Sequence, residues 1–132
     1  MKLSAVAQVN ATTLLIVERT DTVAKLYSVD TSKATNILGS RWDDAATTPS
    51  LEALEDLAPS GIMALPKTLV ADLSKLPGIP DKVEGMAVLD RSIVAIVGDN
   101  DFDVGTFDEN GNNVGSGVKT KIIIIGLAKP LP

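Results

Sequence analysis

Apolar residues along the chain gather in short runs separated by polar turns, a pattern typical of β-strands. The runs are rich in Val, Ile and Leu and are bounded by Gly, Asn, Asp and Ser. They lie at 14–17, 25–30, 67–73, 93–97 and 121–127. Each is far shorter than the ~20 apolar residues that a membrane-spanning helix needs. We therefore predict buried strands and no membrane insertion.

The chain contains an internal repeat. A shift of eighty positions places residues 3–10 over 83–90 and residues 13–17 over 93–97 without a gap. Each copy has a strand, a short polar turn, a second strand and an acidic loop. A third strand is expected in both copies, at 25–30 and at 121–127, and a fourth at 67–73 completes the first copy.

Repeated units of short antiparallel strands are typical of β-propeller blades. We predict an all-β fold of about two propeller-like blades that form an incomplete ring. The first blade is expected to span residues 1–75 and the second residues 82–128. A short helical insertion, 36–66, is expected to interrupt the first blade between its third and fourth strands.

The insertion carries a local helix signal between residues 48 and 57. Thr48 can cap a helix, Pro49 suits its first turn, and Leu51, Leu54 and Leu57 would form one apolar stripe. We predict a surface helix that covers a sheet edge.

Composition then excludes several classes of function. The 132 residues are 45% apolar and 22% charged, which suits one domain with a packed core. The chain has no Cys and no His, so disulfides, Cys/His zinc sites and Ser-His-Asp triads are excluded within it. Aromatic residues make up only 3% and the net charge is −5, so we expect no binding to nucleic acid. Polar side chains interrupt the apolar stretch of residues 1–13, so we expect no signal peptide in this segment.

Carboxylates supply the clearest candidate for a chemical site. No basic residue lies between Arg91 and Lys119, whereas acidic residues alternate after the strand 93–97. Oxygen ligands from a loop suit Ca²⁺. In a β-propeller, a glutamate at the start of an inner strand would lie near one mouth of the central channel, where these strand-end acids would also lie. The predicted calcium ligands are Glu84, Asp99, Asp101 and Asp103. The alternative is a solvated turn in which the aspartates bind nearby backbone amides.

Glu18 and Arg19 are a second candidate, at the equivalent strand end of the first copy. Arg19 could bind a phosphate through two hydrogen bonds, so both residues are predicted to bind substrate. Neighbouring residues of a strand point to opposite faces, so Glu18 and Arg19 would face different surroundings. The alternative is that Arg19 is a partner in a structural ion pair.

The order of several segments resembles a known family. Residues 67–73, 82–90 and 93–102 resemble the C-terminal part of the phytase-like domain, the family of esterase-like activity of phytase. Residues 14–19 resemble the family's apolar strand followed by Glu-Arg, and residues 36–40 its connecting segment. This resemblance implies a secreted, periplasmic or cell-surface β-propeller of which this chain would supply the last blades. It also implies hydrolysis of phosphate or carboxyl esters.

Three functions are therefore open. The chain is a fragment of a hydrolase that acts on a small phosphate or carboxyl ester with possible calcium assistance, a non-catalytic binding module, or a structural fragment. In each case we expect partners in the remaining blades of a longer protein, because two blades leave strand edges bare. The segment 122–125 is four isoleucines and would favour aggregation if exposed.

Overall fold

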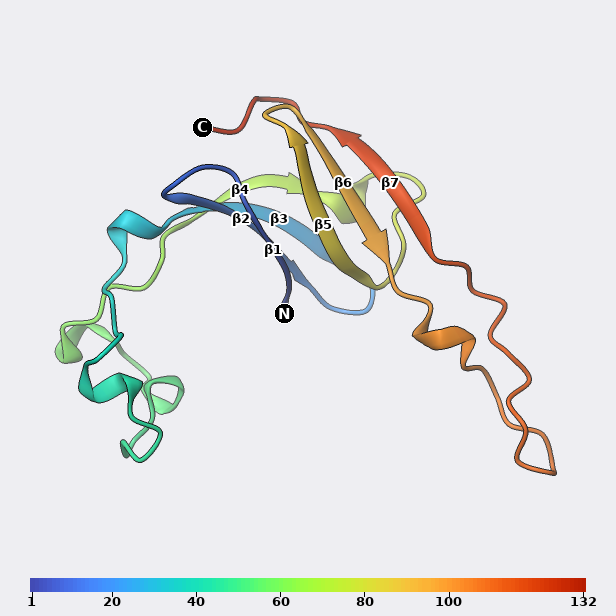
Figure 1. The fold of residues 1–132 in the computed structure, drawn as a ribbon, viewed down its shortest axis with the longest axis horizontal. Coiled ribbons are helices and arrows are strands. Elements are labelled where there is room, and N and C mark those ends of the chain that lie inside the picture. Colours follow the sequence, from blue (N-terminus) through green and yellow to red (C-terminus); the bar gives the residue numbers. More distant parts are fainter.

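Seven strands form two antiparallel sheets in the computed structural model, which describes all residues from 1 to 132 (Figure 1). The first sheet has the order β1 (Lys2–Gln8), β2 (Thr13–Arg19), β3 (Ala24–Asp30) and β4 (Lys67–Asp72). The second has the order β5 (Val83–Asp90), β6 (Ile93–Gly98) and β7 (Lys121–Gly126). The predicted all-β fold with incomplete blades is confirmed.

The repeat appears in the structure as two equivalent hairpins. β1 pairs with β2 and β5 pairs with β6, and the second hairpin follows the first by about eighty residues. In both turns a polar side chain accepts hydrogen bonds from the backbone of the turn. The Asn10 side chain accepts the backbone N–H of Thr12 and Thr13 at 3.0 Å each, and Asp90 accepts that of Ser92 at 2.6 Å. Short polar side chains favour such turns because they bond their own backbone two residues on.

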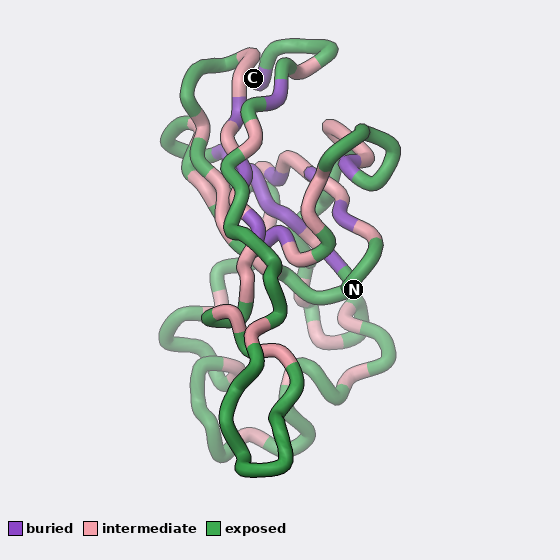
Figure 2. Tube along the Cα trace, turned by 90° about the vertical axis from the view of Figure 1, so that its right-hand side faces the viewer, coloured by how far each residue is buried: buried purple, intermediate pink, exposed green.

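The hydrophobic core lies between the two sheets. Its fully buried residues include Leu15, Val17 and Leu26 from the first sheet and Val94 and Ile96 from the second. The sheets also meet along their inner strands, β1 and β5. Figure 2 shows the buried residues concentrated in this middle region, with exposed loops at the periphery.

The insertion differs from the predicted helix. Residues 36–66 contain three short 3₁₀ helices, Arg41–Asp43, Leu51–Ala53 and Ala58–Ser60, and none of them contains a buried residue. The segment 48–57 thus forms one short turn and not a continuous helix. A helix of this length is marginal in water unless its apolar face is packed, and the insertion extends away from the sheets (Figure 1).

Two glycines of the second sheet provide a test of its packing. A Cβ on buried Gly98 would lie 2.5 Å from Cγ of Pro80, whereas a Cβ on Gly126 would meet nothing within 4 Å. We expect Gly98→Ala to lower the free energy of unfolding by about 1–3 kcal/mol because the added carbon overpacks the site. Gly126→Ala, the matched control in the same sheet, should leave it within about 0.5 kcal/mol of wild type. Urea denaturation measures both values, and equal midpoints for the two variants would contradict this packing.

Candidate functional site

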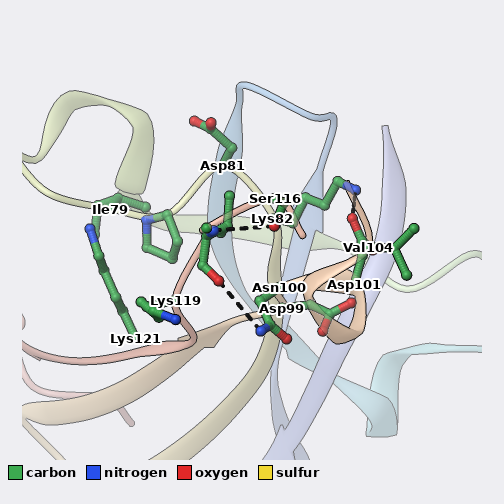
Figure 3. A pocket seen from close by; sticks show the side chains of 13 residues that line it. Ile79, Asp81, Lys82, Asp99, Asn100, Asp101, Val104, Ser116, Lys119 and Lys121 are labelled. Carbon is green, nitrogen blue, oxygen red and sulfur yellow. Dashed lines mark hydrogen bonds and ion pairs between the residues drawn. The ribbon is translucent and has the colours of Figure 1, made fainter. Parts of the chain in front are cut away.

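A polar cleft opens beside the second sheet, where β6 passes into the long loop 99–120. Its volume is about 530 Å³. Charged side chains of both signs line it: Lys82, Lys119 and Lys121 with Asp81, Asp99 and Asp101. Figure 3 shows Lys119 and Lys121 on one side of the cleft and Asp99 with Asp101 on the other.

Strand pairing explains why these residues meet. β6 and β7 are antiparallel neighbours, and Gly98 at the end of β6 lies opposite Lys121 at the start of β7. Residues just after β6 therefore face residues just before β7, although twenty positions separate them in the chain. The backbone N–H of Asp99 also donates to the carbonyl of Lys82 at 2.9 Å, which joins the start of β5 to the same site.

Lys82 and Asp101 form an ion pair at the rim of the cleft. The hydrogen bond from Lys82 lowers the pKa of Asp101, and the same bond raises the pKa of Lys82. Both groups therefore stay charged over the ordinary range of pH. Asp99 forms no ion pair with a lysine or arginine, so its carboxylate is the freer of the two.

Asp103 organises the loop. Its side chain accepts hydrogen bonds from Ser116 Oγ at 2.9 Å and from the backbone N–H of Gly117 at 2.8 Å. These bonds, the one from Ser116 first, lower the pKa of Asp103. Asp108 acts in the same way further along, accepting the backbone N–H of Asn112 at 2.8 Å. Asp103 and Asp108 thus form the hydrogen bonds expected of a turn in which the aspartate side chains accept backbone N–H groups of their own loop.

Glu84 and Arg19 bridge the two sheets. The Arg19 side chain is only 2% exposed, and its guanidinium pairs with Glu84 of β5 and with Asp21. Lys2 also approaches Glu84, at 3.5 Å. The hydrogen bond from Arg19 lowers the pKa of Glu84. Arg19 Nε is buried without a hydrogen-bond partner. The buried charge is therefore compensated through the other two guanidinium nitrogens, by Glu84 and Asp21.

The structure separates Glu18 and Arg19, the two residues predicted to bind substrate. Glu18 lies on the opposite face of β2 from Arg19 and binds Lys67 of β4, with Nζ 2.5 Å from its carboxylate. Each residue of the pair is thus engaged in an ion pair within the protein. This is the arrangement that the alternative interpretation described.

The four predicted calcium ligands lie in different contacts. Asp99 and Asp101 share the cleft, whereas Glu84 pairs with Arg19 and Asp103 binds the loop backbone. No three carboxylates are grouped so that they could hold a metal. Two of the four predicted ligands, Asp99 and Asp101, therefore line one cleft, and a calcium ion, which takes 6–8 oxygen ligands, would need further oxygen donors there.

Sequence reasoning missed the lysines of the cleft. Lys82, Lys119 and Lys121 flank the acidic loop and its neighbouring strand, and the structure brings them to one place. These lysines could have been predicted from the expected pairing of the strands 93–97 and 121–127. Two antiparallel strands bring the residue after the first strand close to the residue before the second.

One comparison with known proteins gives a match. The family model Phytase-like, described as esterase-like activity of phytase, matches residues 1–102. The match includes both sheets as far as β6, together with Glu84, Asp99 and Asp101. No curated protein and no solved structure matches the chain. No helix of the structure is long and apolar enough to cross a membrane.

The bridge between the sheets predicts a pH dependence of stability. The pKa of Glu84 is lowered in the folded protein from its ordinary 4.5, so the ion pair stabilises fully above that value. Its contribution is lost as the pH falls through the lowered pKa. We expect Glu84→Gln to reduce stability at pH 7 by about 1–3 kcal/mol, less than for a fully buried pair because Glu84 is 40% exposed.

Urea denaturation at pH 7 and pH 3 tests this bridge. Wild type should lose more stability between the two pH values than Glu84→Gln does. Glu52→Gln, an exposed change in the insertion, is the control and should follow wild type. The same pH profile in all three proteins would show that the pair contributes nothing.

Proposed function

This chain belongs to the phytase-like family, described as esterase-like activity of phytase, and we propose that it takes part in the hydrolysis of phosphate or carboxyl esters. The substrate would bind in the cleft beside the second sheet. The observation that carries this proposal is the meeting of three lysines and three aspartates in one open space of about 530 Å³.

The lysines suit an ester that carries or develops negative charge. An ammonium group binds phosphate as a compact positive charge, and it stabilises charge that grows on oxygen in the transition state. Lys82 is already paired with Asp101, whereas Lys119 and Lys121 form no ion pair within the chain. We therefore assign substrate binding to Lys119 and Lys121.

Asp99 is the carboxylate that we assign to the attacking water. It lines the same cleft and is not neutralised by a basic side chain, so it can accept a proton from water. Asp101 is a weaker candidate because Lys82 holds it ionised and bonded. Asp101 would instead orient Lys82 at the rim.

The alternative function is a non-catalytic binding or structural module of a β-propeller. Its support is that several of the predicted site residues have structural partners: Glu18 with Lys67, Arg19 with Glu84, and Asp103 with Ser116. In either case we expect the protein outside the cytoplasm, in keeping with the family, and we expect further strand units to complete a ring of blades.

Hydrolysis of p-nitrophenyl phosphate and p-nitrophenyl acetate tests the lysines. We expect Lys119→Ala and Lys121→Ala each to lower kcat/KM for the phosphate ester by about 10-fold, mostly through KM, because each removes a charge that binds the anion. Lys129→Ala, a lysine outside the cleft, should leave the value unchanged. Loss of equal size in all three variants would place the site elsewhere.

Asp99→Asn tests the assignment of the base in the same assays. We expect kcat to fall by about 100-fold with little change in KM, because the amide cannot take the proton. Asp103→Asn is the comparison and should affect mainly thermal stability. A wild-type protein that binds phosphate but hydrolyses neither ester would favour the binding module.

Calcium assistance is the remaining part of the proposal. Because Asp101 is bonded to Lys82, calcium binding would have to replace a contact that already exists. Isothermal calorimetry and thermal shift with calcium chloride, with magnesium chloride as the control, measure this. A calcium-specific rise in Tm that Asp99→Asn removes would support a site in the cleft, and no heat and no shift would remove calcium from the proposal.

A further inference from the structure

One asparagine of this chain differs from the others in sequence and in structure. Asn110 is the only asparagine that precedes a glycine, Gly111, and the only one whose side chain forms no hydrogen bond within the protein. The other five side chains each bond a backbone group or Asp108: Asn10, Asn36, Asn100, Asn112 and Asn113. The asparagine amide is chemically labile, so these two differences bear on how fast each one reacts.

The place of Asn110 in the fold leaves it open to reaction. It lies at the tip of the loop 99–120, which extends away from the sheets (Figure 1). Asn110 and Gly111 are both exposed, and a Cβ built on Gly111 would meet nothing within 4 Å. No neighbouring segment therefore shields the backbone nitrogen of Gly111.

Gly111 also gives the backbone the freedom that the reaction needs. Its φ is +79°, a conformation that glycine adopts without steric cost. Because Gly111 has no Cβ, the peptide unit between it and Asn110 can rotate without a clash. The side chain of Asn110 is not held by a hydrogen bond and can turn towards this peptide unit. The backbone nitrogen of Gly111 can thus reach Cγ of Asn110.

We propose that Asn110 is a site of spontaneous deamidation in which the backbone nitrogen of Gly111 is the nucleophile. This nitrogen gives up its proton and forms a bond to Cγ of Asn110. The bond between Cγ and Nδ2 breaks, and the amide group leaves with the proton as ammonia. A five-membered succinimide ring results. Water opens the ring at either carbonyl, which gives aspartate or isoaspartate, so that one water is consumed and one ammonia is released.

Asp108 opposes this reaction because it holds the turn closed. Its side chain accepts the backbone N–H of Asn110 at 2.9 Å and that of Asn112 at 2.8 Å. Its carbonyl accepts the N–H of Gly111 at 3.0 Å, and the attacking nitrogen must first leave this bond. An exposed loop tip opens at a low cost in free energy. The reaction therefore proceeds when the turn opens, and Asp108 determines how often it does.

Deamidation changes both the charge and the backbone of the loop tip. It makes the net charge of −5 more negative by one, in a segment that has no basic residue between Arg91 and Lys119. Isoaspartate also adds one backbone atom between Asp108 and Asn112, which alters their hydrogen bond. The reaction requires neither the cleft nor ester hydrolysis, so the two proposals fail separately.

Peptide mapping of the full chain after incubation at pH 8 is the first test. We expect Asn110 to convert at least about 10-fold faster than any other asparagine, because Gly111 leaves its nitrogen unhindered. Digestion at acidic pH and fragment masses locate each conversion. Enzymatic methylation with labelled S-adenosylmethionine detects isoaspartate, which only the opening of a ring produces. Equal rates at all asparagines would overturn the site, and aspartate without isoaspartate would overturn the attack by Gly111.

Variants followed by ion-exchange chromatography test the residues separately. Asn110→Ser should abolish the more acidic form that appears during incubation. Asn36→Ser, a change at an exposed asparagine of the insertion, is the matched control and should give this form at the wild-type rate. Asp108→Ala should give it at least about 3-fold faster, because the turn then loses its side-chain bonds.

Circular dichroism and Tm check that each variant is folded. An acidic form that appears in Asn110→Ser as fast as in wild type would overturn the proposal. An unchanged rate in Asp108→Ala would overturn the protecting role of Asp108.

Discussion

The packing of the two sheets against each other is the interaction on which the rest of the structure depends. Each fully buried aliphatic side chain between them, such as Leu15 or Ile96, contributes about 1.5–3 kcal/mol relative to an exposed one. At the edge of this interface Arg19 is buried, and its charge is compensated by Glu84 of the other sheet. The ion pair has a directional requirement that apolar contacts lack, so it restricts how the sheets can slide past each other.

Strand pairing within the second sheet places the cleft. The starts of β5 and β7 and the end of β6 meet at one corner of the second sheet, and Lys82, Lys121 and Asp99 come together there. The aspartates of the loop would repel one another if left alone. Lys82 neutralises Asp101, and one backbone amide and one hydroxyl bind Asp103, which leaves Asp99 and two lysines for a ligand. Stability and candidate chemistry thus use different members of one acidic segment.

Strands were predictable where apolar runs were short, regular and bounded by turn residues. The hairpins closed by Asn10 and Asp90 follow from local chemistry, because a short polar side chain accepts a hydrogen bond from the backbone N–H two residues further on. The segment with Leu51, Leu54 and Leu57 shows the limit of such reasoning. Its spacing predicted a helix, but a stripe with no surface to pack against does not stabilise one, and only a 3₁₀ turn forms.

By itself, the sequence determined the strand segments, the eighty-residue repeat, the family and the absence of histidine and cysteine chemistry. These follow from residue types and their spacing along the chain. Only the tertiary structure decided which charges pair, Arg19 with Glu84 and Glu18 with Lys67, and that Lys119, Lys121 and Asp99 line one cleft. The reason is geometric. Ion pairs and clefts depend on strand register and on which face each sheet buries. Glu18 meets Lys67 and the cleft forms through strand pairing within a sheet, whereas Arg19 meets Glu84 only when the two sheets pack.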